Sequence, residues 1–321
     1  MSALLEVRDL RIDIPMPSGT LHAVRGIDLD LERGQTLCVV GESGCGKSLT
    51  ALGLMGLLPR KAKRTASKLL FNGEDLSKAD ARRMNKVRGD RMTMVFQEPM
   101  TALNPCLTIG EQLTEVLRHH RGTPSREATE RAVFLLGKVG IPAPAQRLGQ
   151  YPHQLSGGLR QRVMIAMALM CGPDLVVADE PTTALDVTIQ AQILLLLREL
   201  QREFHMGLLL ITHDLGVVAN IADRVAVMYA GEVVETGTAA EVFAQPSHPY
   251  TRGLLSCVPV PGRTRGTALG VVPGTVPSLV GGIRGCAFRE RCSLAIGGCA
   301  DPGPVTAQVS PGRTVRCLRA A

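Results

Sequence analysis

The feature that most constrains the fold of this sequence is the octapeptide GESGCGKS at residues 41–48. It follows the apolar run QTLCVV, precedes the helix-prone run SLTALGLMGLL, and matches the pattern G-x-x-x-x-G-K-[ST]. Glycines in such a turn let backbone N–H groups wrap phosphates, and the next helix directs its positive end at the same anion. Lys47 suits the β- and γ-phosphates, and the Ser48 hydroxyl suits Mg²⁺. We therefore predict a nucleotide site at this phosphate loop (residues 41–48), with these binding residues: Gly41, Glu42, Ser43, Gly44, Cys45, Gly46, Lys47, Ser48 and Leu49.

Strand-like and helix-like segments alternate along most of the chain, which favours an α/β fold with a largely parallel sheet. Two alternating segments, LLEVRDLRIDI and LHAVRGIDLDL, predict half-buried antiparallel strands near the N-terminus. Aromatic residues make up only 3% of the chain, so its core must be aliphatic, as suits buried parallel strands. After about residue 245, Pro and Gly become frequent and periodicity fades. We expect a nucleotide-binding domain over 1–250, mostly helical at about 100–160, and an irregular C-terminal extension over 251–321.

Two further stretches carry groups suited to nucleotide chemistry. LVVADE (175–180) is an apolar strand that ends in two acids. We expect Asp179 to hold Mg²⁺ and Glu180 to polarise an attacking water. QLSGGLRQRVMIAMAL (154–169) places Ser156, Gly157 and Gly158 before a long helix, which is a second helix start fit for a phosphate. Because one nucleotide needs one phosphate loop, this segment is explained if it completes a site on a different subunit.

Taken together, these motifs resemble the ATP-binding subunits of ABC transporters. LSGGL corresponds to the signature motif of that family, with Leu159 where Gln is common. The resemblance implies an ABC-type P-loop ATPase with a RecA-like core, an antiparallel β subdomain and a helical subdomain. It also implies Gln97 in VFQEP as the Q-loop glutamine, Asp186 in TTALD as the D-loop aspartate, and His213 in LLITHD as the switch histidine.

The same resemblance implies how the site works. Two such domains dimerise head to tail, and the phosphate loop of one and the Ser156–Gly158 segment of the other enclose each ATP. Lys47, Glu180, Gln97 and His213 are the implied catalytic residues, and Ser48, Gln97 and Asp179 the implied Mg²⁺ ligands. The chain departs from the family upstream of the phosphate loop, since it has no aromatic residue before Phe71 to stack on adenine. His22 or an aliphatic side chain is the candidate to cover the base.

Other stretches resemble the dipeptide, oligopeptide and nickel importer branch: QEPMTALNP, YAGEVVETG, PSHPYTRGLL, VVPGTVPSL and GCAFRERC. This implies ATP hydrolysis coupled to import of short peptides or a related small solute. The implied partners are a second homologous ATPase subunit, most often different from this one, two transmembrane permease subunits and an extracytoplasmic solute-binding protein.

The sequence also bears on location and on rival functions. It carries no signal-peptide pattern and no run long enough to span a bilayer, so we expect a peripheral protein at the cytoplasmic face of the inner membrane. The net charge of +7 is spread along the chain, which argues against nucleic acid as a partner. The alternatives are a soluble ABC ATPase that acts on ribosomes or nucleic acid, and an ATP-binding regulatory module without turnover.

Four of the nine cysteines lie in the last 36 residues: Cys286, Cys292, Cys299 and Cys317, with spacing C-x5-C-x6-C-x17-C. The expected reducing compartment disfavours disulfides, and the C-x2-C knuckles typical of structural zinc are absent. Four thiolates on Gly- and Pro-rich loops can enclose a [4Fe–4S] cluster, with one cysteine for each iron. Importers of this branch with such a cysteine set resemble proteins that carry this cluster. We therefore expect [4Fe–4S], with Zn²⁺ or incidental thiols as the alternatives.

Overall fold

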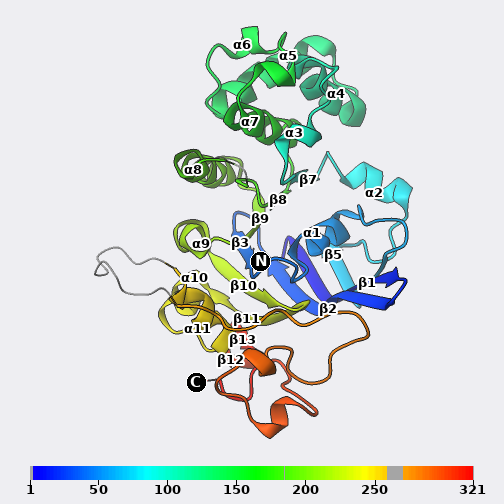
Figure 1. Cartoon of the computed structure of the whole chain (residues 1–321). Coiled ribbons are helices and arrows are strands. Elements are labelled where there is room, and N and C mark those ends of the chain that lie inside the picture. Colours follow the sequence, from blue (N-terminus) through cyan, green and yellow to red (C-terminus); the bar gives the residue numbers. More distant parts are fainter. Residues whose placement is uncertain (1–2, 184, 259–269, 321) are drawn as a thin grey trace, which may run out of the picture. The chain divides into compact units, whose positions relative to one another are not determined.

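A computed structural model describes residues 3–183, 185–258 and 270–320 of the chain (Figure 1). The chain divides into two compact units, each made of segments distant in sequence. Unit 1 comprises Met1–Leu31, Leu37–Ser77 and Ile211–Ala321, and unit 2 comprises Glu32–Thr36 and Lys78–Leu210. The predicted boundary between a nucleotide-binding domain at 1–250 and an extension at 251–321 stays a prediction.

Unit 1 contains the predicted antiparallel strands near the N-terminus. Strand β1 pairs with β2, β4 and β5, and β5 pairs with β6, all antiparallel. Leu5 and Val7, and then Leu10 and Ile12, are almost fully buried, so burial alternates as the sequence predicts on either side of a register shift between Val7 and Leu10. The strands of this sheet are β1 (Leu5–Met16), β2 (Gly19–Leu31), β4 (Lys63–Thr65), β5 (Lys68–Phe71) and β6 (Glu74–Asp75).

The second sheet of unit 1 carries the phosphate loop. Its strands lie in the order β12-β13-β11-β10-β3, with β10 parallel to β3 and the others antiparallel. Every residue of β3 is buried, and the phosphate loop connects β3 to helix α1. The strands are β3 (Thr36–Val40), β10 (Arg224–Tyr229), β11 (Glu232–Thr238), β12 (Ala307–Ser310) and β13 (Arg313–Val315). The helices of this unit are α1 (Lys47–Met55), α9 (Leu215–Ile221), α10 (Ala239–Ala244) and α11 (Pro249–Ser256).

The C-terminal extension is largely irregular, as expected, but it is attached firmly to unit 1 (orange to red in Figure 1). Its hairpin β12–β13 adds to the edge of β11. Nearer its start, the Leu279 carbonyl accepts from the His22 N–H at 2.9 Å, and the Gly281 N–H donates to the Thr20 carbonyl at 3.1 Å. Between these points lie two short helical turns, η2 (Arg289–Arg291) and η3 (Gly297–Cys299).

Unit 2 contains the predicted helical region and the strand that ends in two acids. Its strands lie in the order β9-β8-β7, with β8 parallel to β7, and the last two residues of β9 belong to unit 1. Helices α4 to α7 gather in one group (Figure 1). The strands are β7 (Met92–Val95), β8 (Leu175–Asp179) and β9 (Gly207–Thr212). The helices are α2 (Ala81–Val87), α3 (Pro99–Ala102), α4 (Ile109–Arg121), α5 (Ser125–Lys138), α6 (Pro144–Arg147), η1 (Pro152–Gln154), α7 (Gly157–Ala168) and α8 (Val187–Phe204).

The local sequence explains where the helices of unit 2 begin. Thr108 accepts from the Glu111 N–H, and the Glu111 carboxylate accepts from the Thr108 N–H, which is a capping box at the start of α4.

Arg33 and Arg91 both form ion pairs with Asp174, just before β8. Burial alone would raise the pKa of Asp174, but these two guanidinium groups outweigh it and lower that pKa.

In the ranges that the structure describes, no helix is both long and apolar enough to cross a membrane.

Candidate nucleotide-binding site

The phosphate loop depends on glycine at two positions because the chain passes very close to neighbouring strands. Gly41 has φ 156°, and a Cβ placed on it would lie 2.2 Å from the Met228 carbonyl oxygen on β10. Gly46 has φ 101°, and its Cβ would lie 2.4 Å from the Ala23 carbonyl oxygen on β2. No side chain fits at either distance, so the loop can take this path only with glycine. The sequence motif thus reflects packing as well as phosphate binding.

The Lys47 amine lies inside the phosphate loop. Its Nζ donates to the Gly41 carbonyl at 2.8 Å and to the Glu42 carbonyl at 3.0 Å, and the residue is 4% exposed. Helix α1 begins at this lysine, and its N-cap residue, Gly46, provides no side-chain cap. The amine and the start of α1 therefore both lie where the sequence predicts phosphates to bind.

The structure brings two predicted catalytic residues together in unit 2. The Gln97 amide donates to the Glu180 carboxylate at 3.4 Å, and the Thr183 hydroxyl donates to the same carboxylate oxygen at 3.1 Å. Glu180 directly follows β8 and has φ 43°, a left-handed conformation that is uncommon for a residue with a side chain. Asp179, the last residue of β8, is 6% exposed. Strained backbone of this kind is often found at functional sites, and here it coincides with the predicted catalytic acid.

The other predicted site residues of unit 2 lie at helix starts. Ser156 is the N-cap of α7 and accepts from the Leu159 N–H at 3.4 Å, so Gly157 and Gly158 form the first turn of that helix. Asp186 is the N-cap of α8 and accepts from the Ile189 N–H at 2.9 Å. Asp186 therefore has a local structural role that the sequence analysis did not identify.

The site residues fall into two groups. Gln97, Asp179, Glu180, Asp186 and the Ser156–Gly158 segment belong to unit 2, whereas the phosphate loop and His213 belong to unit 1. His213 directly follows β9. A joint site formed by the two groups stays a prediction.

Two residues near the phosphate loop show how its surroundings are built. The Tyr250 hydroxyl accepts from the Glu42 N–H at 2.9 Å, a contact that the sequence analysis missed although it noted the stretch PSHPYTRGLL. The only signal was the position of an aromatic residue in a family-typical stretch.

The Nδ1 of His22, the candidate to cover adenine, lies 2.7 Å from an Asp13 carboxylate oxygen, and the His22 side chain is 37% exposed.

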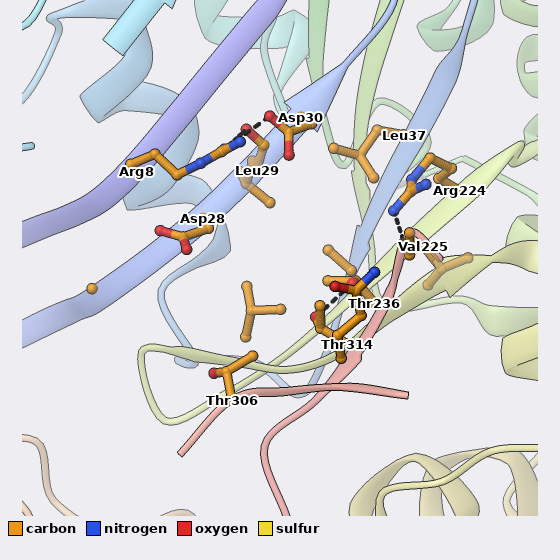
Figure 2. Close-up of a pocket in the computed structure, with 15 residues that line it drawn as sticks. Arg8, Asp28, Leu29, Asp30, Leu37, Arg224, Val225, Thr236, Thr306 and Thr314 are labelled. Carbon is orange, nitrogen blue, oxygen red and sulfur yellow. Dashed lines mark hydrogen bonds and ion pairs between the residues drawn. The ribbon is translucent and has the colours of Figure 1, made fainter. Parts of the chain in front are cut away.

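A cavity of about 310 Å³ lies elsewhere in unit 1, between the N-terminal sheet and the β10–β11–β13 sheet (Figure 2). Arg8 pairs with Asp30 at 2.8 Å, and the hydroxyls of Thr236 and Thr314 are 2.8 Å apart. No phosphate-loop residue lines this cavity. Two pairs of its polar side chains thus satisfy each other.

The four C-terminal cysteines all line one small cavity, of about 10 Å³, together with His248 and Phe288. Burial raises the pKa of the Cys286 and Cys317 thiols. Across residues 3–183, 185–258 and 270–320, however, no group of three or more His, Cys, Asp or Glu side chains is arranged to hold a metal ion. The structure thus places the four cysteines around one space, and the predicted cluster stays a prediction.

Comparison with known proteins agrees with the fold and the motifs. The model of the ABC transporter family matches residues 24–183, and the model of the oligopeptide/dipeptide transporter C-terminal region matches residues 234–299. The chain is 50% identical over 317 residues to the dipeptide transport ATP-binding protein DppD of Bacillus subtilis, covering 98% of this chain and 92% of that protein. It is 49% identical over 318 residues to the oligopeptide transport ATP-binding protein OppD of Salmonella typhimurium, covering 99% and 94%.

Solved structures confirm the predicted fold class. A dimeric, post-hydrolysis structure of the ATP-binding cassette MJ0796 bound to ADP and Pi matches with a TM-score of 0.65 and 27% identity, covering 73% of this chain and 98% of that one. The structure of cbiO1 from Clostridium perfringens, part of the transporter complex cbiONQ, matches with a TM-score of 0.64 and 28% identity, covering 76% and 92%. On the sequence matches and this shared fold, the chain belongs to the ATP-binding proteins of the ABC transporter family, in the branch that has the oligopeptide/dipeptide C-terminal region.

Proposed function

We propose that this protein is the ATP-hydrolysing subunit of an ABC importer for short peptides or a related small solute. One observation carries the proposal. The phosphate loop is folded with the Lys47 amine inside it and glycine at both crowded positions, in a chain whose C-terminal region matches the oligopeptide/dipeptide transporter model. The names of DppD and OppD support peptides as the solute class. The same C-terminal match disfavours the alternative of a soluble ATPase acting on ribosomes or nucleic acid.

The residues of the chain suit ATP and Mg²⁺. The Lys47 amine is held by two carbonyl groups of the loop, and phosphate oxygens are stronger acceptors that can replace them. Ser48, Gln97 and Asp179 would hold the metal, which supplies charge neutralisation at the phosphates. The Ser156–Gly158 segment would bind the γ-phosphate of the nucleotide on the partner ATPase subunit. ATP as ligand follows from the family, whereas these individual roles are part of the proposal.

Hydrolysis would proceed through groups at the end of β8 and β9. The Glu180 carboxylate would orient a water and accept its proton as the water oxygen attacks the γ-phosphorus and the bond to the ADP oxygen breaks. In the present conformation this carboxylate accepts from Gln97 and Thr183, so it is already held at a defined position. His213 would contact the γ-phosphate.

The assembly is proposed by analogy with relatives. A dimer of ATPase domains is supported by the dimeric cassette structure, and transmembrane permease subunits by the family to which the chain belongs. A second, different ATPase subunit, an extracytoplasmic solute-binding protein and a location at the cytoplasmic face of the membrane complete the proposal. We also propose residues 1–250 as the nucleotide-binding domain and 251–321 as the extension.

We further propose that Cys286, Cys292, Cys299 and Cys317 hold a [4Fe–4S] cluster, with Zn²⁺ as the alternative. Support comes from the shared cavity and from a donor set of four thiols on short irregular segments. Burial raises the pKa of the Cys286 and Cys317 thiols, so they would be protonated without the metal and would release protons as it binds. Protein purified without oxygen should be brown, with about four iron and four sulfide per chain. Colourless protein with stoichiometric zinc would support the alternative, and metal-free protein would contradict both.

The test of function uses the assembled importer in proteoliposomes. Peptide uptake should require ATP, and Glu180→Gln should bind ATP normally while phosphate release falls by about 100-fold or more. Glu199→Gln, which changes the same residue type on α8, should hydrolyse ATP like the wild type. Wild-type turnover in Glu180→Gln would contradict the catalytic assignment. ATP turnover that is stimulated by ribosomes or nucleic acid, without peptide uptake, would support the alternative.

A further inference from the structure

Arg291 joins the cysteine-bearing extension to the phosphate loop through an ion pair with two hydrogen bonds. It is the last residue of η2 and directly precedes Cys292. Its Nη1 lies 2.6 Å from Glu42 Oε2, and its Nη2 lies 2.9 Å from Glu42 Oε1. The Arg291 side chain is 5% exposed and that of Glu42 is 27% exposed. This is the planar, bidentate geometry in which an Arg–carboxylate pair is strongest.

The guanidinium group is fixed on its other sides as well. Its Nε donates to the Pro273 carbonyl at 2.7 Å, and its Nη2 donates to the Val272 carbonyl at 3.1 Å. Its Nη1 also lies 3.3 Å from the Tyr229 hydroxyl, and the guanidinium carbon (Cζ) lies 5.6 Å from the centre of the Tyr229 ring. Every N–H donor of the guanidinium group therefore has an acceptor, so the group is held ready for Glu42 rather than recruited to it.

Glu42 links Arg291 to the residues that are predicted to bind the nucleotide. Its N–H donates to the Tyr250 hydroxyl, and its carbonyl oxygen accepts from the Lys47 amine at 3.0 Å. Its carboxylate is a negative charge within a loop that is built to bind anions. Without a partner, this carboxylate would repel the phosphates, and the repulsion is strong because water is partly excluded there. Arg291 offsets that charge.

We propose that Arg291 is a positioning residue for nucleotide binding. It neutralises the Glu42 carboxylate and fixes the first turn of the phosphate loop, so that the affinity of the loop for nucleotide depends on the extension that carries the cysteines. This inference rests on the proposed function, because it assumes that the phosphate loop binds ATP. It goes beyond that function by giving the extension a direct role in nucleotide affinity.

The test measures binding of Mg·ADP to the full-length chain by calorimetry, so that hydrolysis does not contribute. Arg291→Gln should weaken binding about tenfold, the effect of roughly 1.4 kcal/mol of lost favourable interaction. Arg291→Gln combined with Glu42→Gln should recover most of the affinity. Glu290→Gln, on the same turn but 78% exposed at its side chain, is the matched control and should bind like the wild type.

The recovery in the double variant separates electrostatic positioning from general damage to the extension. If Arg291→Gln merely disrupts the fold, Glu42→Gln will not restore binding, and the proposal fails. If Arg291→Gln does not fold, Glu42→Asp gives the same test, because its shorter side chain breaks the bidentate pair and leaves Arg291 in place. Wild-type affinity in Glu42→Asp, or in Arg291→Gln, would overturn the proposal. If the wild-type chain binds no nucleotide, it is the proposed function that fails.

Discussion

The ion pair between Arg313 and Glu235 should make unit 1 depend on the C-terminal extension for its stability. Arg313 lies on β13 and Glu235 on β11, and their charged atoms are 3.1 Å apart. The Glu235 carboxylate is completely buried and also accepts from the N–H groups of Ser247 and His248, both at 2.9 Å. Replacing Arg313 with Met would keep the side-chain stem but leave this carboxylate without a counter-charge.

The expected loss is about 3 kcal/mol of unfolding free energy, at the low end of the range for breaking a buried ion pair. The low end applies because the two backbone N–H groups still bind the carboxylate. Arg313→Met combined with Glu235→Leu should recover to within about 1 kcal/mol of the wild type, since a well-packed apolar pair removes the uncompensated charge.

Urea unfolding followed by tyrosine fluorescence measures this effect. Tyr229 and Tyr250 are buried in unit 1, and the chain has no Trp to mask them. Arg126→Met is the control, because Arg126 pairs with Glu130 on the surface and its side chain is 90% exposed. Removing that pair should cost at most about 0.5 kcal/mol. If Arg313→Met is no less stable than Arg126→Met, the reasoning about the buried pair is wrong.

Two further predictions use pairs of similar positions. Gly46→Ala should abolish Mg·ADP binding because its Cβ would collide with the Ala23 carbonyl. Gly44→Ala, with no atom within 4 Å of its Cβ, should cost only about 1 kcal/mol of backbone strain. Equal Mg·ADP affinities of these two variants in a calorimetric titration would contradict this. Asp186→Ala and Asp80→Ala each remove a helix N-cap in unit 2 and should each cost about 1 kcal/mol in urea unfolding. Only Asp186→Ala should also lower phosphate release by the assembled importer, and an equal effect of both variants would reduce Asp186 to a capping residue.

The parts of the fold that could be predicted are those with short-range signals. The phosphate loop, the buried β3 and the alternating β1 and β2 each carry their pattern within about a dozen residues, and the structure has them where expected. The α/β fold class and the family are confirmed by the comparisons. The roles of the individual site residues and the four-cysteine cluster stay predictions.

The contacts that could not be predicted join residues distant in sequence. Arg291 and Glu42 are 249 positions apart, and Arg313 and Glu235 are 78 apart. Nothing in the local pattern around an arginine shows which carboxylate it will meet. The hairpin β12–β13 was also missed, because β12 has four largely exposed residues and β13 has only three residues, too few to show the apolar alternation that identifies longer strands.

The attachment of the extension has a practical consequence for measuring motion. The extension is hydrogen-bonded to β2, ion-paired to the phosphate loop and paired as a strand to β11. A fluorophore placed on it should therefore report the movement of unit 1 as a whole, rather than the tumbling of a tail. Cys106 of unit 2 is exposed and offers a thiol for the second dye. Energy transfer between these two positions would then follow how the two halves of the ATPase move during a transport cycle.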